Sequence, residues 1–161
     1  MQPRPAHPTE IEQLARVWYD AWQDAHAQIL PAELTRVRTF DTFRQRLGPM
    51  LPNTSVVGDL GSPIGLCAIK QDELDQLFVS ATGRGTGVAT ALIADAEARL
   101  AAAGVGTAWL SCAIGNDRAA RFYEKSGWHL ARNYVSRLDT PAGVFELEVW
   151  RYEKNLQPLT G

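Results

Sequence analysis

The sequence predicts a mixed α/β fold, in which one β-sheet carries helices on both faces. The first half contains short strands whose connections are too short for a crossover helix. The second half alternates strand-like and helix-like segments. The 161 residues, 45% hydrophobic and 21% charged, have the size and composition of one globular domain, predicted to span residues 1–161.

The N-terminal third is predicted to be mainly helical. After a short strand at residues 2–6, Thr9 and Glu12 match a capping box. The apolar residues that follow have helical spacing: Ile11, Leu14, Ala15, Trp18 and Trp22. Pro31 interrupts this pattern, and a second helix is expected over residues 41–51, before a Pro-Asn pair breaks it.

The middle of the chain is predicted to form an antiparallel meander of three strands, at residues 55–59, 64–70 and 73–79. The Gly-Ser pair at 61–62 suits a hairpin turn. From Gly87 the apolar spacing becomes helical. The remaining elements follow in order: a helix to Gly104, a strand at 108–112, a helix at 116–126, and strands at 128–135 and 144–152. The sequence therefore predicts six to seven strands and about four helices.

Charge and cysteine usage exclude several classes of function. A net charge of -2 gives no basic footprint for nucleic acid, and no apolar run is long enough to span a membrane. The N-terminus lacks the apolar core of a secretory signal, so we expect a cytoplasmic protein. Cys67 and Cys112 are expected to be free buried thiols. The histidines and cysteines do not have metal-ligand spacing, so no metal is expected.

A glycine cluster lies where a strand meets a helix. Gly83, Gly85 and Gly87 allow positive φ and a close approach of the backbone to a ligand. The first N–H groups of the following helix lack intrahelical partners, so the site suits phosphate, to which Arg84 adds a cation. The cluster also suits a turn that only connects two elements. It lacks the further residues of a dinucleotide fingerprint or a P-loop.

Three segments together resemble the GNAT superfamily of N-acetyltransferases. They are Leu77-Phe78-Val79, Arg84-x-x-Gly87-x-Ala89 and Asn116-x-x-Ala119-x-x-Phe122-Tyr123-x-x-x-Gly127-Trp128. Their agreement in order and spacing over residues 64–128 carries the resemblance. The resemblance implies the GNAT fold and an enzyme that transfers an acetyl group from acetyl-CoA to an amine of a small molecule or peptide. Transfer would occur by direct attack within a ternary complex.

The resemblance implies which residues hold acetyl-CoA, the expected cofactor. The loop would bind its pyrophosphate through backbone N–H groups of Arg84, Gly85, Thr86, Gly87, Val88 and Ala89, with Thr90 close by. The strand Leu77-Phe78-Val79 would pair with the pantetheine arm, and the N–H of Val79 or Leu77 would polarise the acetyl carbonyl. Asn116 would contact the pantetheine, although it also suits a plain helix N-cap.

The resemblance also implies the catalytic residues. Tyr123 matches a tyrosine that faces the coenzyme sulfur, where a phenol of pKa ~10 can protonate a leaving thiolate. It also suits an ordinary aromatic position on an amphipathic helix. Glu73 stands where family members place a general base, and Asp75 shares its strand face roughly 7 Å away unless a bulge intervenes. Both acids also suit solvated strand ends.

The resemblance places the acceptor between the first two helices and the late strands. Candidate acceptor contacts are Tyr19, Trp22, His26 and Asp75. A basic cluster (Arg36, Arg38, Arg44 and Arg46) is expected to be a solvated helix face, with attraction of an acidic acceptor as the functional alternative. The aromatic end of the last strand is compatible with a homodimer.

Two other functions stay open at this point. The same fold can hold acyl-CoA as a non-catalytic sensor or interaction module. It can also transfer another acyl group, such as propionyl or succinyl. The presence of Tyr123 and of an acid on the preceding strand argues against the sensor.

Overall fold

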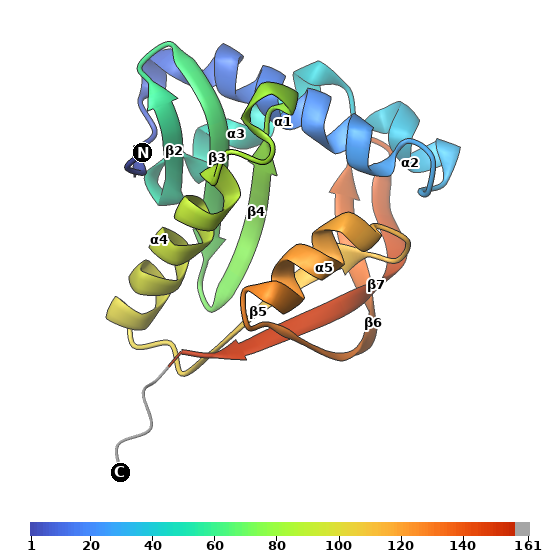
Figure 1. Ribbon diagram of the computed structural model, residues 1–161. Coiled ribbons are helices and arrows are strands. Elements are labelled where there is room, and N and C mark those ends of the chain that lie inside the picture. The colour runs from blue at the N-terminus through green and yellow to red at the C-terminus, as the bar shows by residue number, and fades with distance from the viewer. Residues whose placement is uncertain (157–161) are drawn as a thin grey trace.

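The computed structural model describes residues 1–156, over which the chain forms a seven-stranded sheet of order β1-β2-β3-β4-β5-β7-β6 (Figure 1). The strands are β1 (Arg4–Pro5), β2 (Thr54–Asp59), β3 (Ser62–Lys70), β4 (Glu73–Val79), β5 (Thr107–Ala113), β6 (His129–Thr140) and β7 (Gly143–Asn155). All neighbours are antiparallel except β4 and β5, which are parallel. The predicted mixed sheet is confirmed.

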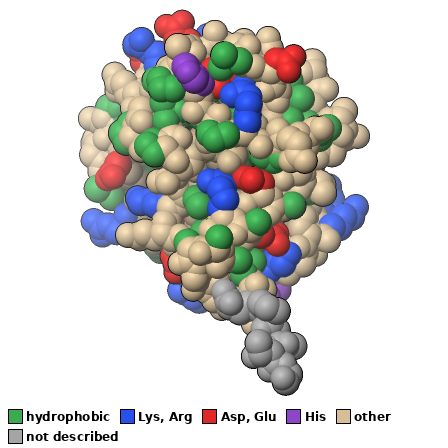
Figure 2. Space-filling view, turned by 90° about the vertical axis from the view of Figure 1, so that its left-hand side faces the viewer, with side chains coloured by type: hydrophobic (Ala, Val, Ile, Leu, Met, Phe, Trp, Pro, Cys, Tyr) green, Lys and Arg blue, Asp and Glu red, His purple; other side chains and the backbone are tan. Residues whose placement is uncertain are grey.

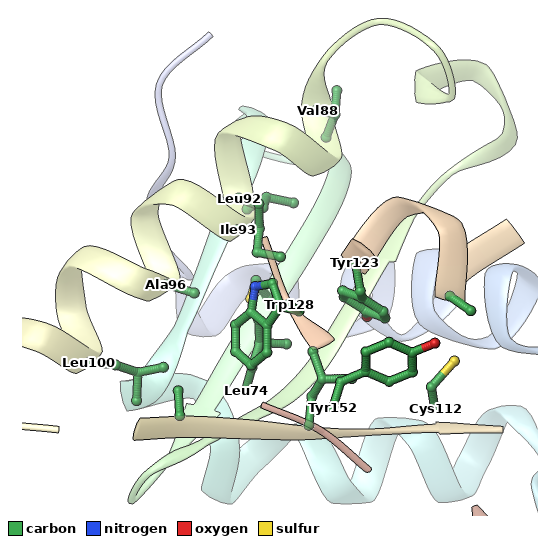
Figure 3. Close-up of a cluster of buried hydrophobic side chains, with 14 of the residues drawn as sticks. Leu74, Val88, Leu92, Ile93, Ala96, Leu100, Cys112, Tyr123, Trp128 and Tyr152 are labelled. Carbon is green, nitrogen blue, oxygen red and sulfur yellow. The ribbon is translucent and has the colours of Figure 1, made fainter. Parts of the chain in front are cut away.

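Helices cover both faces of this sheet, as predicted. Within the described residues they are α1 (Ile11–His26), α2 (Ala32–Val37), α3 (Phe40–Met50), α4 (Val88–Ala102) and α5 (Asp117–Lys125). One hydrophobic cluster packs α4 and α5 on one face, and Figure 3 shows part of it. A second cluster packs α1, α2 and α3 on the opposite face. The molecule therefore has two cores separated by the sheet.

In the N-terminal third, one local prediction is wrong and one helix was not predicted. The capping box uses His7 and Glu10 instead of Thr9 and Glu12, because a 3₁₀ turn at Pro8–Glu10 precedes α1. Proline tolerates this first-turn position, since its missing N–H would have no partner there. The helix α2 was not predicted, because Pro31 is the N-cap of a new helix instead of a simple interruption.

An irregularity in β4 shapes the centre of the sheet. Ala68 pairs with Gln76 and Ile69 with Leu74, which leaves Asp75 as the extra residue of a β-bulge. The only residue pair between β4 and β5 in the described chain is Glu73 with Trp109. Beyond this pair the two parallel strands separate (Figure 1), so the upper half of β4 has no strand partner on its β5 side.

The remaining sequence-based expectations concern cysteines, metals and membranes. Cys67 and Cys112 are free and buried, as predicted. In residues 1–156, no helix combines the length and apolarity needed to cross a membrane, and no three potential metal ligands gather. Acidic and basic side chains are interspersed on the face shown in Figure 2. The predicted domain end at Gly161 lies outside the described residues.

Candidate active site

A cleft of about 330 Å³ opens where β4 and β5 separate. Its walls come from the end of β4, the loop before α4, the first turns of α4 and α5, and one side of α1. The structure brings all of the predicted cofactor residues except Thr86 to this cleft: Leu77, Phe78, Val79, Arg84, Gly85, Gly87, Val88, Ala89, Thr90, Asn116 and Tyr123. Residues far apart in the sequence thus surround one cavity.

The glycine-rich turn presents the N-terminus of α4 to the cleft. Gly85 and Gly87 have φ of 74° and 91°, which glycine adopts without strain. No side chain caps the N-terminus of α4. The first N–H groups of this helix, at the positive end of its dipole, are therefore available to an anion. Thr86 supports the turn from within, because its Oγ1 donates to the Gly83 carbonyl at 2.6 Å.

The unpaired half of β4 directs backbone groups into the same cleft. The N–H of Ser80 donates to the Ile64 carbonyl at 2.8 Å. Because hydrogen-bonded pairs alternate in antiparallel strands, Phe78 bonds to β3 while Leu77 and Val79 direct their N–H and C=O groups toward β5. No β5 residue pairs there in the described chain. An extended ligand can therefore add to β4 as a strand would.

Tyr123 closes the inner end of the cleft. The residue is 8% exposed, and its ring packs against Phe122, Trp128 and Tyr152. Figure 3 shows Trp128 and Tyr152 near it. The hydroxyl forms no hydrogen bond within the described chain, although the residue lines the cleft. Burial raises the pKa of Tyr123 well above its ordinary value. The phenol is therefore protonated at neutral pH and can donate a hydrogen bond or a proton to a group in the cleft.

Asn116 is both a helix N-cap and a residue of the cleft wall. Its side chain caps α5 by accepting the backbone N–H of Ala119 at 3.4 Å. It also lines the cleft. The helix cap and the cleft wall are therefore compatible.

Besides Gly83, Ala119 and Phe122, which the sequence motifs contain, three residues that sequence reasoning missed line the cleft. Ala21 and Ala25 form its α1 side, and their spacing of four residues on one helix face was the available signal. Arg118 lies at the cleft in the first turn of α5 and is exposed. Its position two residues after Asn116 could have indicated a second cation for an anionic ligand.

The two predicted acids lie in the first half of β4, where Glu73 pairs with Trp109 of β5. Glu73 and Asp75 are half-buried and do not line the cleft itself. Burial, reinforced by the charge of Asp75, raises the pKa of Glu73 to about 7. Burial also raises the pKa of Asp75. Glu73 is therefore poised to exchange a proton near neutral pH.

The predicted acceptor contacts on α1 lie in the hydrophobic core and not in the cleft. Tyr19 packs edge-on against Phe40 and Phe43. Trp22 and His26 are buried, and His26 Nδ1 donates to the Trp22 carbonyl at 2.9 Å. Burial lowers the pKa of His26 to about 4, so its ring is neutral. These side chains support the α1 wall and do not face the cleft.

The basic cluster is only partly the solvated face that the sequence predicted. Arg36 and Arg44 are exposed, as expected. Arg38 is buried, with 4% of its surface exposed, and Arg46 is half-buried. The expectation of solvation is therefore wrong for these two arginines, because Arg38 bonds to Asp139 of the β6–β7 hairpin and Arg46 stacks on Trp18 of α1.

Comparisons with known proteins agree with this geometry. The model of the Acetyltransferase (GNAT) family matches residues 11–128. No curated protein matches the chain significantly. Among solved structures, a GCN5-related N-acetyltransferase from Rhodopseudomonas palustris has a TM-score of 0.75 at 21% identity, with 96% of each chain covered.

Two further structures with the same fold contain the coenzyme. PaiA N-acetyltransferase from Thermoplasma acidophilum, in complex with coenzyme A, has a TM-score of 0.71 at 17% identity and covers 96% of this chain and 98% of its own. The acetyltransferase YncA from Salmonella typhimurium, described as putative and bound to acetyl-CoA, has a TM-score of 0.72 at 12% identity. That match covers 100% of this chain and 96% of the other. At these identities the likeness shows the fold alone.

Proposed function

The chain belongs to the acetyltransferase (GNAT) family, and on this basis we propose that it is an N-acetyltransferase. It would transfer an acetyl group from acetyl-CoA to an amine of a small molecule or peptide, acting as one domain over residues 1–161. The observation that carries the proposal is the cleft in which an uncapped helix N-terminus, an unpaired strand edge and Tyr123 meet.

The proposed cofactor position follows from the chemistry of the cleft walls. The pyrophosphate of acetyl-CoA would lie at the N-terminus of α4, where backbone N–H groups and the helix dipole favour an anion. The pantetheine arm, which carries amide groups, would pair with Leu77 and Val79 along the unpaired edge of β4. This direction leads the thioester from the loop toward Tyr123.

The proposed reaction is direct attack of the neutral amine on the thioester carbonyl. The N–H of Val79 or Leu77 would stabilise the oxyanion. Glu73, directly or through water, would accept the proton of the amine, and Tyr123 would donate a proton or a hydrogen bond to the departing coenzyme thiolate. The new C–N bond replaces the C–S bond, so no acyl-enzyme is needed.

The working environment is part of the same proposal. We propose that the enzyme acts in the cytoplasm and needs no metal. Its partner would be the acceptor amine, and it would bind neither nucleic acid nor a membrane. The C-terminal strands β6 and β7, of which β6 is the edge of the sheet, would form the surface for a homodimer.

The test measures acetyl-CoA binding by calorimetry and thiol release across an amine panel. Tyr123→Phe is compared with Tyr152→Phe, which removes a neighbouring buried hydroxyl that bonds to Glu124 and does not line the cleft. We expect Tyr123→Phe to lower kcat about 10²-fold or more at unchanged acetyl-CoA affinity, whereas Tyr152→Phe keeps its activity. Equal turnover in the two variants would remove Tyr123 from its acid role. Saturable binding without any turnover would favour the sensor instead.

A further inference from the structure

The first part of the sheet, strands β1–β4, meets the second part, strands β5–β7, where β4 begins. Glu73 and Trp109 are the only residues that pair across this junction in the described chain. The backbone N–H of Trp109 donates to the Asp72 carbonyl at 3.2 Å. The indole Nε1 of Trp109 donates to the Asp72 carboxylate at 2.9 Å. Asp72 therefore holds Trp109 through both its backbone and its side chain.

The turn that carries Asp72 contains a strained backbone residue. Lys70 pairs with Glu73, so Gln71 and Asp72 form a two-residue hairpin turn. Gln71 has a φ of 55°, and no other residue of the described chain except glycine has a positive φ. Such strain persists where the surrounding contacts fix the conformation, and it gathers at functional sites. The strained turn places Asp72 opposite Trp109.

Further contacts fix the orientation of the Trp109 indole. Ala108 and Leu110 belong to the cluster of α4 and α5, so the Trp109 side chain points to the opposite face of the sheet. There the guanidinium of Arg151, on β7, lies 4.3 Å from the centroid of the indole. The ring of Tyr134, on β6, packs edge-on at 6.0 Å. These contacts connect the Asp72–Trp109 pair to all three strands of the second part of the sheet.

The groups of the proposed reaction are divided between the two parts of the sheet. The first part carries the glycine-rich turn, Glu73 and the β4 edge with Leu77 and Val79. The second part carries Tyr123, on the helix that follows β5. Transfer needs the β4 edge and the phenol on opposite sides of one thioester, so the separation of β4 from β5 must be fixed. The Asp72–Trp109 pair lies at the point from which the two strands separate.

We propose that Asp72 and Trp109 are positioning residues, which fix the separation of β4 from β5 and thereby align Tyr123 with a thioester held along β4. The inference rests on the proposed function, because the transfer reaction is what needs this alignment. Neither residue lines the cleft. The proposed pyrophosphate site lies on the loop before α4, within the first part of the sheet, so the pair should affect turnover more than the affinity for coenzyme A.

Three substitutions separate the hydrogen bond of the pair from the charge of Asp72. Trp109→Phe removes the indole donor and keeps an aromatic ring for the contacts with β6 and β7. Asp72→Ala removes the acceptor, and Asp72→Asn keeps a carbonyl acceptor without the charge. Asp72 is exposed, so its variants should fold even if Trp109→Phe does not.

Glu97→Gln is the matched control for stability. Glu97 lies on α4, which packs on the first part of the sheet, and it accepts from Lys154 of β7 at 2.6 Å. This contact joins the same two parts of the sheet but does not involve the junction of β4 with β5. For every protein, thiol release with acetyl-CoA measures kcat and KM, calorimetry measures the Kd for coenzyme A, and thermal unfolding measures Tm.

We expect Trp109→Phe and Asp72→Ala each to lower kcat about tenfold, with the Kd for coenzyme A within about twofold of wild type. The double variant should lose no more than either single variant, because all three lack the same hydrogen bond. Asp72→Asn should keep most of the wild-type kcat. Glu97→Gln should keep all of it, even where its Tm falls.

The charge of Asp72 provides the alternative explanation. The charged groups that act on the Glu73 carboxyl are Asp75, Lys70, Asp72 and Arg151. If Asp72 acted only through its charge, Asp72→Asn and Asp72→Ala would shift the acidic limb of the pH–rate profile equally to lower pH, and Trp109→Phe would leave kcat unchanged. Either result overturns the inference and leaves the transferase function intact. Absence of turnover by wild type would instead count against the proposed function and, with it, the inference.

Discussion

Arg84 of the glycine-rich turn and Asp24 of α1 form an ion pair, with 3.0 Å between Nη2 and Oδ2. The pair joins the two walls of the cleft, because Ala21 and Ala25 on the same helix form its opposite side. The Asp24 side chain is 56% exposed, so the attraction is weak and screened by salt. A bound pyrophosphate would compete with Asp24 for the same guanidinium.

Removal of this competitor should strengthen coenzyme binding. We expect Asp24→Asn to lower the Kd for coenzyme A by about twofold to fivefold at low salt, which is the range of an exposed ion pair. Asp20→Asn is the matched control, because Asp20 pairs with Arg16 on the outer side of α1. Isothermal titration at two salt concentrations measures both variants. Weaker binding by Asp24→Asn would show that Asp24 positions Arg84 instead of competing for it.

Arg118 should contribute to coenzyme binding from the other side of the cleft. It is exposed and forms no ion pair in the described chain, so its charge is available to a phosphate at the mouth of the cleft. We expect Arg118→Ala to raise the Kd for coenzyme A about fivefold, and the effect should shrink in high salt. Arg121→Ala removes an exposed arginine of the same helix that does not line the cleft. Equal effects of the two changes would indicate only a general charge effect.

Glu73 should determine the acidic limb of the pH–rate profile. A base accepts a proton only when ionised, so kcat/KM should rise with pH through the Glu73 pKa of about 7 and then level off. In Glu73→Gln this limb should disappear and the plateau should fall, whereas Tyr123→Phe should keep the limb. An unchanged limb in Glu73→Gln would assign the base to another group, with Asp75 as the next candidate.

The raised pKa of Glu73 also makes the stability of the folded protein depend on pH. The folded protein holds the Glu73 proton more tightly than the unfolded chain, so this group favours folding fully below pH 4.5 and loses that contribution as the pH rises through about 7. Glu73→Gln should therefore gain stability relative to wild type across this interval. Thermal unfolding of both proteins at pH 4.5 and pH 8 measures the difference.

Local sequence signals predicted most of the elements because their causes are local, whereas the residues of the cleft were predicted from the family resemblance. The left-handed glycines at 85 and 87 and the N-cap at Asn116 depend on a few neighbouring residues. The helix α2 escaped prediction because its six residues are too few to show a periodic pattern. The six longer strands were all predicted, but β6 extends to Thr140 and β7 to Asn155, beyond the predicted ends at 135 and 152.

The missed features depend on contacts between distant segments. Arg84 and Asp24 are 60 positions apart. The bulge at Asp75 arises from the register with β3, which the sequence of β4 alone does not encode. Arg46 stacks on Trp18, which lies on another helix, α1. Sequence reasoning therefore named most of the residues that line the cleft, whereas the residues that it named on α1 lie in the core.

The corrected capping box leads to a prediction about stability. Glu10 is 1% exposed, and its carboxylate accepts two hydrogen bonds from Arg4 and one each from the backbone N–H groups of His7 and Gly61. The hydrogen bond from Arg4, opposed in part by burial, lowers the pKa of Glu10 from 4.5 to about 2. Through these hydrogen bonds the Glu10 carboxylate, at the start of α1, connects β1 with the β2–β3 turn.

Glu10→Gln should destabilise the fold by about 2–4 kcal/mol at neutral pH, because it leaves the half-buried Arg4 without its charge partner. A carboxyl with a lowered folded-state pKa stabilises the protein above pH 4.5 and loses that effect as the pH falls toward 2. The gap between wild type and Glu10→Gln should therefore narrow over this interval in urea unfolding. Glu12→Gln, the residue that the sequence favoured as the cap, is exposed and should change stability by less than about 0.5 kcal/mol. A larger loss of stability in Glu12→Gln than in Glu10→Gln would instead support the capping box of Thr9 and Glu12.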